Sequence, residues 1–485
     1  SPSAGMASPF TGSAPTPVNF GPQLPGQELP ALPTTPKSRE SNDDDEEEKF
    51  YSARRSPSPE KYLPPGEIGL RNLGNTCYQN AVFQALSHTD ELANFFRHGA
   101  HQDDINEENF LGYGGKLANL WEQLVKTLWD HEQSYALNPR PMRDAVSEMN
   151  PMFEGYQQHD AQEFMAWLLD GLHEDLNRTK GKKPNAVLED IMPKELEDKS
   201  EERLAAEAWW VHLKREKSYL VDLFQGQLRS KVECKECGYF SIRFDPFMYL
   251  SLPVHNKDGQ PVEDLPDALK SFSEPEDLTG DEQWHCEQCK KKVDAVKQIS
   301  IYKVPPILLL HLKRFAFDAD TCSMTKLDDL VKFPLKGMGS APTESQATSE
   351  TGSISKKVDL AMKQHIQSEQ KDEPVYDLIA TVDHLGSTPN FGHYVAKAYN
   401  HSDRKWQLFD DNWVTDLDAD DVVADSNYIL VFRRGTGRGV MDLESYKKIP
   451  RQSVSHPQFW PHRGDMAGAG TASNPAWFDI LYTEL

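Results

Sequence analysis

Two Cys-x-x-Cys pairs constrain the fold of this chain more than any other feature. Cys234 and Cys237 form the first pair, and Cys286 and Cys289 form the second. A tight hairpin can present both thiolates of one pair to a single ion, and four thiolates in a tetrahedron suit a structural Zn²⁺. The separation is too wide for a compact zinc ribbon, so the fold has to bring two hairpins together. The alternative is two unrelated pairs of free cysteines.

Hydrophobic periodicity predicts helices in the first half of the chain and strands in the second. The strongest pattern is a helix over 160–177, where apolar residues recur at helical spacing. Further helices are expected at 76–98, 115–130 and 203–218, with a charged, irregular connection at 180–200. Strands are expected at 221–228, 242–252, 297–302, 307–313, 376–382, 394–398, 406–410 and 428–432. Helices followed by mostly antiparallel strands predict an α+β fold.

Composition sets the limits of the folded part. Residues 1–60 are rich in Pro and Ser and include an acidic run, so we expect a disordered N-terminal tail. Order is expected to begin near residue 62, and a polar insertion at about 336–357 interrupts the strand pattern. Residues 434–485 are expected to form a C-terminal tail.

Cys77 is a candidate nucleophile. It follows a turn-forming run and stands at the head of an apolar helix expected over 78–86. Backbone N–H groups and the helix dipole favour negative charge at a helix N-terminus, and thiols in such positions ionise more easily than free ones. The alternative is that Cys77 is a small buried apolar residue, as many free cysteines are.

His393 and Asp410 are candidate partners for this thiol. His393 follows Gly392 at the start of an apolar strand, and Asp410 ends the next strand. Adjacent antiparallel strands would place the carboxylate beside the imidazole, as in catalytic triads. Asn72 carries an amide that can donate to an oxyanion. Spacing alone leaves open a packing histidine and surface aspartates.

Several blocks resemble the signatures of the ubiquitin-specific protease family of deubiquitinating cysteine proteases. The run 69–80 resembles the cysteine box of that family, and 155–164 resembles its Gln- and Asp-rich box. The segments 376–386, 393–394 and 406–414 resemble its histidine box, and the strands 305–315 and 428–432 are also typical. The resemblance covers roughly residues 67 to 433, with the blocks in family order. It implies a catalytic domain over 67–433, with a zinc-bearing fingers subdomain at about 220–300.

The resemblance implies roles for individual residues. Cys77 matches the nucleophile, His393 the general base and Asp410 the third member of the triad. Asn72 matches the oxyanion donor, and Asp411 a neighbouring polar position that assists.

The resemblance also implies a substrate and a fold. Asp160 and Glu163 match acidic positions that hold the arginine-containing tail of ubiquitin, and Gln158 of the same box matches a substrate-binding position. The alternative for these two carboxylates is an ordinary helix N-terminus with favourable acidic residues, and both roles can hold at the same time. The implied fold is papain-like, with a helical thumb, a β-rich palm and β fingers, and the four cysteines of the two pairs match the zinc site of the fingers.

The loop before His393 departs from the family, because residues 387–392 lack the usual glycine-rich run, which predicts a stiffer loop. The expected partners are ubiquitin and ubiquitin-conjugated proteins, and oligomeric state is not indicated. A net charge of -24 opposes nucleic-acid binding. The sequence contains no run of about 18 apolar residues, so a membrane span is not predicted. Six cysteines suit a reducing compartment, so we expect a cytoplasmic or nuclear protein.

Three other functions are compatible with parts of the sequence. An inactive scaffold that binds ubiquitin is opposed by the presence of the complete set Cys77, His393, Asp410 and Asn72. A protease for a different ubiquitin-like modifier would use the same residues. A zinc-dependent nucleic-acid binder is opposed by the acidic charge.

Overall fold

The computed structural model describes residues 63–130, 135–179, 190–318, 323–338, 375–388 and 391–435. The predicted N-terminal tail, nearly all of the polar insertion and all but the first residues of the C-terminal tail lie outside these ranges. Within them, none of the helices combines the length and apolar character that a membrane span requires.

Helices form the first part of the described chain, as predicted. They are α2 (Cys77–Ser87), α3 (Asp90–Arg97), α4 (Lys116–Asp130), α5 (Arg140–Met149) and α6 (Ala161–Asp175), with 3-10 turns η1 (Ala100–Asp104) and η2 (Pro151–Phe153). The helix expected over 76–98 is divided between α2 and α3. Hydroxyl groups of Ser87 and Thr89 bond to carbonyl oxygens one turn back at this break, which is how such side chains compete with regular helix bonding.

Three more helices lead from the helical half into the strands: α7 (Pro193–Asp198), α8 (Glu201–Leu213) and α9 (Tyr219–Phe224). The prediction of a strand beginning at 221 is therefore wrong for its first half, and α7 lies in the predicted irregular connection. Ser218 caps α9, because its hydroxyl oxygen accepts a hydrogen bond from the Val221 N–H at 3.3 Å. The periodicity of a short apolar run does not distinguish a helix from a strand. Here the hydrogen bond from the Ser218 cap stabilises the helix.

The largest sheet has seven strands in the order β14-β13-β12-β11-β15-β8-β3. They are β3 (Tyr249–Pro253), β8 (Ile307–Lys313), β11 (Tyr376–Thr388), β12 (Phe391–Asn400), β13 (Lys405–Asp410), β14 (Trp413–Leu417) and β15 (Asn427–Arg434). All neighbouring pairs are antiparallel except β3 and β8, which run parallel. Helix α10 (Leu265–Phe272) packs near β3, and η4 (Ala419–Asp421) precedes β15.

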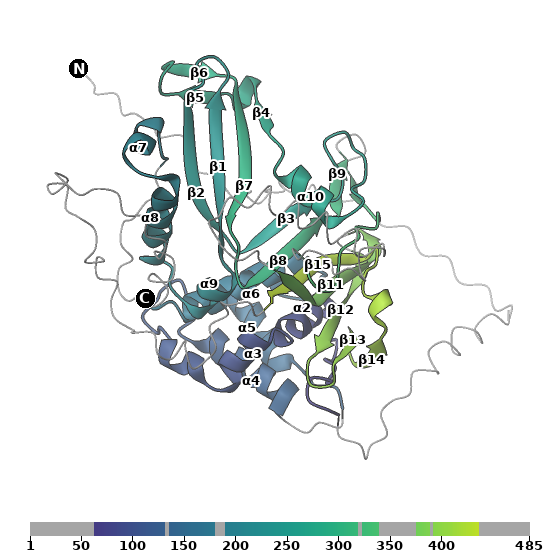
Figure 1. Cartoon of the computed structure of the whole chain (residues 1–485). Helices are drawn as coiled ribbons and strands as arrows, with labels where there is room; N and C mark the ends of the chain where they lie inside the picture. Colours follow the sequence, from purple (N-terminus) through teal and green to yellow (C-terminus); the bar gives the residue numbers. More distant parts are fainter. Residues whose placement is uncertain are drawn as a thin grey trace, which may run out of the picture. The chain divides into compact units, whose positions relative to one another are not determined.

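A separate four-stranded sheet has the order β2-β1-β7-β4. Its strands are β1 (Gly226–Cys234), β2 (Phe240–Phe247), β4 (Glu276–Leu278) and β7 (Ala295–Lys303), and η3 (Gly280–Glu282) follows β4. Two hairpins complete the strands: β5 (Trp284–Cys286) with β6 (Lys291–Val293), and β9 (Phe315–Asp318) with β10 (Ser323–Lys326). Figure 1 shows the long strands β1, β2 and β7 side by side, with β5 and β6 at their end.

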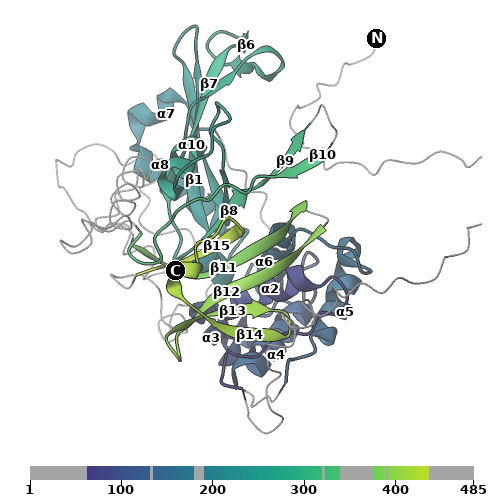
Figure 2. The same cartoon turned by 90° about the vertical axis from the view of Figure 1, so that its right-hand side faces the viewer.

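The core joins the helices to the large sheet. All eleven residues of α2 are buried, and the helix lies against β11 and β12 on one side and α6 on the other (Figures 1 and 2). Apolar side chains from α2, α4, α6 and the sheet form one continuous cluster. The predicted α+β fold is confirmed, with thumb helices, a palm sheet and finger strands. Because α2 is packed on both sides, its first residue has a fixed position.

Candidate active site and metal centre

Cys77 is the first residue of α2, and only 2% of its surface is exposed. The turn before it has left-handed backbone at Gly74 (φ 103°) and Asn75 (φ 53°). A Cβ on Gly74 would lie 2.6 Å from the Tyr156 ring, so this position requires glycine. The amide of Asn75 donates to the carbonyl oxygen of Tyr156 at 2.8 Å. These contacts hold the turn so that the thiol lies at the helix N-terminus, where backbone N–H groups lack intrahelical acceptors.

His393 lies on β12, and Asp410 ends the antiparallel neighbour β13. Nε2 of His393 is 2.7 Å from Oδ1 of Asp410. The bond to Asp410 and then the interaction with the nearby thiol of Cys77 raise the pKa of His393 to about 10, against the opposing effect of burial. The imidazole is therefore positively charged at neutral pH. The structure thus places the three predicted triad residues together.

Asp411 has a different set of contacts from its neighbour Asp410. Its Oδ1 accepts a hydrogen bond from Asn80 at 2.8 Å, and its Oδ2 accepts one from Asn72 at 2.9 Å. Its distance to Nε2 of His393 is 4.0 Å, which is too long for a hydrogen bond. Burial raises the pKa of Asp411. Asp410 therefore holds the imidazole, whereas Asp411 holds the chain around Cys77.

The amide of Asn72 is fixed on both sides. Its nitrogen donates to Asp411, and its oxygen accepts hydrogen bonds from the N–H groups of Gly74 at 2.9 Å and Thr76 at 3.2 Å. Only one of the two N–H bonds of a carboxamide is needed for the contact with Asp411. Asn72 thus lies in the turn ahead of Cys77, with its donor group held in place by the half-buried carboxylate of Asp411.

Asp160 and Glu163 begin α6 but differ in how their carboxylates are used. Oδ1 of Asp160 accepts hydrogen bonds from the N–H groups of Gln162 at 2.6 Å and Glu163 at 3.4 Å, so Asp160 is the N-cap. Its Oδ2 accepts a bond of 2.5 Å from the Tyr428 hydroxyl. Glu163 is exposed, although partial desolvation by neighbouring groups, followed by the charge of Asp160, raises its pKa. Glu163 therefore has the more available carboxylate.

Gln158 was predicted to bind substrate. Its Nε2 donates to the carbonyl oxygen of Gly392 at 2.6 Å, and its Oε1 accepts from the N–H of Gly392 at 3.0 Å. Both polar atoms of this side chain are thus directed to the residue that precedes His393.

Two residues of the site were not identified from the sequence. Asn80 lies one helical turn after Cys77, and its amide reaches Asp411. That spacing was an available signal, because residues three apart share a helix face. Tyr428, by contrast, lies 268 positions from Asp160 in an apolar strand, and nothing local indicates their contact.

The four cysteines of the two pairs meet at the ends of two hairpins, β1–β2 and β5–β6. Sγ of Cys234 is 4.0 Å from Sγ of Cys289, and Sγ of Cys237 is 3.6 Å from Sγ of Cys286. Sulfur atoms at about 2.3 Å from one tetrahedral Zn²⁺ would be roughly 3.8 Å apart. The four thiols therefore fit a single metal ion, and the prediction that two separate hairpins converge is confirmed.

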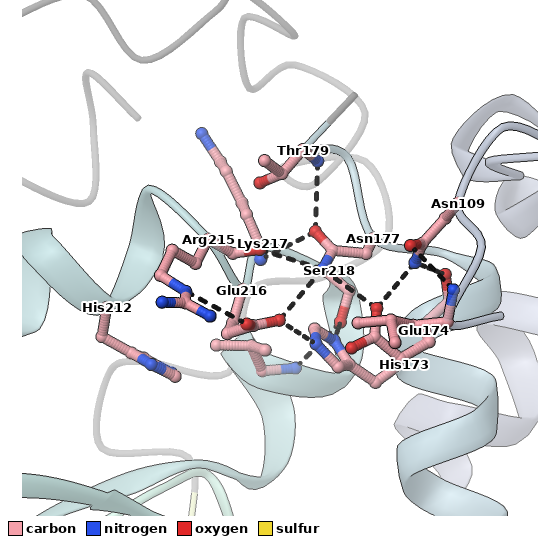
Figure 3. A network of polar contacts seen from close by, with 12 residues as sticks. Asn109, His173, Glu174, Asn177, Thr179, His212, Arg215, Glu216, Lys217 and Ser218 are labelled. Atoms are coloured by element: carbon pink, nitrogen blue, oxygen red, sulfur yellow. Dashed lines mark hydrogen bonds and ion pairs between the residues drawn. The ribbon is translucent and has the colours of Figure 1, made fainter. Parts of the chain in front are cut away.

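Another group of ligand-type side chains lies at the C-terminal end of α6 (Figure 3). Nδ1 of His173 is 2.7 Å from Oγ of Ser218, and its Nε2 is 3.1 Å from Oε2 of Glu216. Glu174 accepts a bond of 2.6 Å from the amide of Asn109. These atoms are already used in hydrogen bonds that connect α6 to the segment before α9 and, through Asn109, to the segment before α4. We therefore assign them a structural role.

A thiol at a helix N-terminus, an imidazole from the opposing sheet and a carboxylate behind it define a cysteine hydrolase of the thumb-and-palm type. The model of the family named ubiquitin carboxyl-terminal hydrolase matches residues 68–432. The chain belongs to this family, which confirms the resemblance seen in the sequence.

Individual relatives agree with this assignment. Ubiquitin carboxyl-terminal hydrolase 2 of Homo sapiens is 33% identical over 390 residues, covering 78% of this chain and 58% of that protein. Ubiquitin carboxyl-terminal hydrolase 21 of Homo sapiens is 32% identical over 397 residues, covering 80% of this chain and 65% of that protein. The chain thus spans less than two thirds of the length of either relative.

Solved structures support the fold. The SAGA DUB module of Ubp8, Sgf11, Sus1 and Sgf73 bound to monoubiquitin matches with a TM-score of 0.55 and 22% identity, covering 80% of this chain and 74% of that one. The same module bound to ubiquitin aldehyde matches with a TM-score of 0.54 and 23% identity.

Proposed function

We propose that this chain is a deubiquitinase that hydrolyses the peptide or isopeptide bond after the C-terminal glycine of ubiquitin. The observation that carries the proposal is the alignment of Cys77, His393 and Asp410, with Nε2 of His393 2.7 Å from the carboxylate. The names of the family and of its relatives support ubiquitin as the substrate. Similar structures bound to monoubiquitin or ubiquitin aldehyde support it further.

In the acylation step, the thiolate of Cys77 attacks the carbonyl carbon of the terminal glycine. The positive charge of His393 stabilises the thiolate before attack. The imidazolium then transfers its proton to the departing lysine amine as the C–N bond breaks, which leaves a thioester on Cys77. Asp410 keeps the ring oriented and stabilises its charged form.

Negative charge builds on the carbonyl oxygen during attack. We assign the second N–H of Asn72 and the backbone N–H groups at the start of α2 as its donors, because they are positioned before the reaction begins. Asp411 and Asn80 hold this region in place. In the second step His393 takes a proton from water, the hydroxide attacks the thioester, and Cys77 leaves with free ubiquitin released.

The start of α6 provides the contact with the substrate tail. Glu163 has an exposed carboxylate at a helix N-terminus, suited to pair with a guanidinium group of the arginine-containing tail. Asp160 contributes indirectly, because its two oxygens are used by the helix cap and by Tyr428.

A Zn²⁺ ion held by Cys234, Cys237, Cys286 and Cys289 would have a structural role. Four thiolates leave no open coordination position. When bound, the ion would connect the hairpins β1–β2 and β5–β6 and keep the finger strands together.

We also propose that the protein is located in the cytoplasm or nucleus. The free cysteines among the described residues support this location, because such compartments keep thiols reduced. Imaging of a tagged full-length chain would test it.

Turnover of a fluorogenic amide at the C-terminus of ubiquitin tests the proposed function. The wild-type chain should release the fluorophore, and Cys77→Ser should reduce kcat by about 10⁴-fold or more. Ubiquitin binding without turnover by the wild type would instead favour an inactive scaffold. Matching amides of other ubiquitin-like modifiers would reveal a different substrate, and di-ubiquitins of defined linkage would then establish the chain preference.

A further inference from the structure

The side chain of Gln158 bonds to the backbone of Gly392 in the way that a residue of a neighbouring strand would, with one donated and one accepted hydrogen bond. Its carboxamide donates to the Gly392 carbonyl at 2.6 Å and accepts from the Gly392 N–H at 3.0 Å. The two residues are 234 positions apart, with Gln158 just before α6 and Gly392 on β12. Because His393 follows Gly392 directly, this contact connects the helical half of the domain to the backbone that carries the imidazole.

The geometry of the β11–β12 hairpin explains why Gly392 requires an outside partner. His393 pairs with Leu385 and Phe391 pairs with Thr388, so the register shifts between them and Gly392 falls at the irregularity. At such an irregularity the ladder leaves backbone groups unpaired. The backbone N–H and carbonyl of Gly392 form their hydrogen bonds with the side chain of Gln158 instead. This side chain therefore replaces the missing strand contact at this position.

His384 supports Gly392 from another direction. A Cβ added to Gly392 would overlap Nε2 of the His384 ring, so only glycine fits between them. His384 is fully buried, and its ring is 5.1 Å from that of Phe315 and 4.8 Å from that of Tyr394. Burial lowers the pKa of His384 to about 4, so this ring adds no positive charge beside His393 near neutral pH.

We propose that Gln158 is a positioning residue, which fixes Gly392 so that the imidazole of His393 stays aligned between Cys77 and Asp410. This role differs from the substrate contact that the family resemblance implied for Gln158. It rests on the proposed function, since alignment matters only if His393 transfers protons. Misplacement of a catalytic group by about 1 Å can cost on the order of 100-fold in rate.

Replacement of Gln158 by methionine tests the proposal, because methionine has similar length and cannot form either hydrogen bond. Gln158→Met should lower kcat for the ubiquitin amide by about tenfold or more and change KM by less than roughly threefold. The exposed neighbour Gln157 provides the matched control, and Gln157→Met should retain wild-type kcat and KM. A raised KM with unchanged kcat for Gln158→Met would show substrate binding and overturn the proposal.

The protonation of His393 gives a readout that does not depend on turnover. The charged or titratable groups that face His393 are Cys77, Asp410, Asp411 and His384. In the full chain with ¹⁵N-labelled histidine, the His393 signal is assigned by its absence in His393→Gln. Its titration midpoint should fall by about one pH unit or more in Gln158→Met, because the imidazole is no longer held against Asp410 and Cys77.

The two readouts separate failure of this inference from failure of the proposed function. If the wild type has no activity on ubiquitin, the proposed function is wrong, and the titration still tests the positioning role. If the wild type is active while Gln158→Met has unchanged kcat and midpoint, the positioning role is wrong. Should Gln158→Met not fold, Gln158→Asn keeps a carboxamide that is one methylene too short, and the same lower kcat and midpoint are expected.

Discussion

At the residue scale, two adjacent aspartates divide the work of the site. Asp410 bonds to the imidazole of His393, and Asp411 bonds to the amides of Asn72 and Asn80. The sequence could suggest both carboxylates, because a strand ending in Asp-Asp next to a histidine strand is visible locally. The family resemblance assigned Asp410 to the triad, but the local pattern could not show that Asp411 bonds to the two amides, which depends on its left-handed backbone (φ 48°).

The division predicts different effects on catalysis. Asp410→Ala should lower kcat by roughly 10² to 10⁴, because the imidazole loses both orientation and charge stabilisation. Asp410→Asn should lose less, since an amide oxygen still accepts a bond from the ring. Steady-state kinetics on a ubiquitin amide provides the measurement. Wild-type kcat in Asp410→Ala, together with a large loss in Asp411→Ala, would mean that Asp411 holds the imidazole.

The same pair predicts a dependence of stability on pH. The pKa of His393 is raised in the folded chain to about 10 from an ordinary 6.5. The pair therefore stabilises the fold fully below about pH 6.5 and loses this effect as pH rises through 10. Urea unfolding should show Asp410→Ala destabilised by about 1 kcal/mol at pH 6, a value discounted for solvent screening of a partly exposed pair. A gap that widens toward pH 10 would contradict this sign.

The carboxylates that begin α6 predict another contrast. Asp160→Ala should lower stability by about 1–2 kcal/mol, since it removes a helix cap and the partner of the Tyr428 hydroxyl. Glu163→Gln should leave the melting temperature unchanged and raise KM for ubiquitin about 5- to 30-fold through loss of a charge-assisted bond. The assignment fails if Asp160→Ala melts like the wild type and only its KM rises.

At the element scale, local patterns located most helices and strands but missed where they begin. The strand expected from 221 starts at Gly226 instead, because Ser218 caps the short helix α9 ahead of it. The two Cys-x-x-Cys pairs predicted converging hairpins correctly, since their chemistry requires it wherever they lie in the chain. The contact between Gln158 and Gly392 had no such signal, because neither residue is unusual in its own segment.

The converging hairpins predict the effect of metal removal. The purified chain should contain one zinc per molecule, and Cys237→Ser should lose it and lower the melting temperature by roughly 5 °C or more. Cys322→Ser, outside both pairs, serves as the control and should retain one zinc. Elemental analysis with thermal unfolding gives the comparison. Full stability of a zinc-free chain would show that these cysteines do not form a structural centre.

At the scale of the whole molecule, the site exists only where separate parts of the chain meet. Cys77 comes from a helix, His393 and Asp410 from the sheet, and Gln158 from the segment before α6. The order of the family motifs in the sequence was enough to predict which residues meet. It did not predict the contacts that hold them in place, such as that of Gln158 with Gly392. The finger cysteines form a separate cluster, in two hairpins that contribute none of the triad residues.

Reaction with a ubiquitin whose C-terminus carries an electrophile tests the central claim most directly. The wild-type chain should form a covalent adduct of one ubiquitin, and peptide mass spectrometry should locate it on Cys77. Cys77→Ser should form no adduct, whereas Cys322→Ser should react like the wild type. Absence of an adduct on the folded, zinc-loaded wild type, or an adduct on another cysteine, would contradict the account.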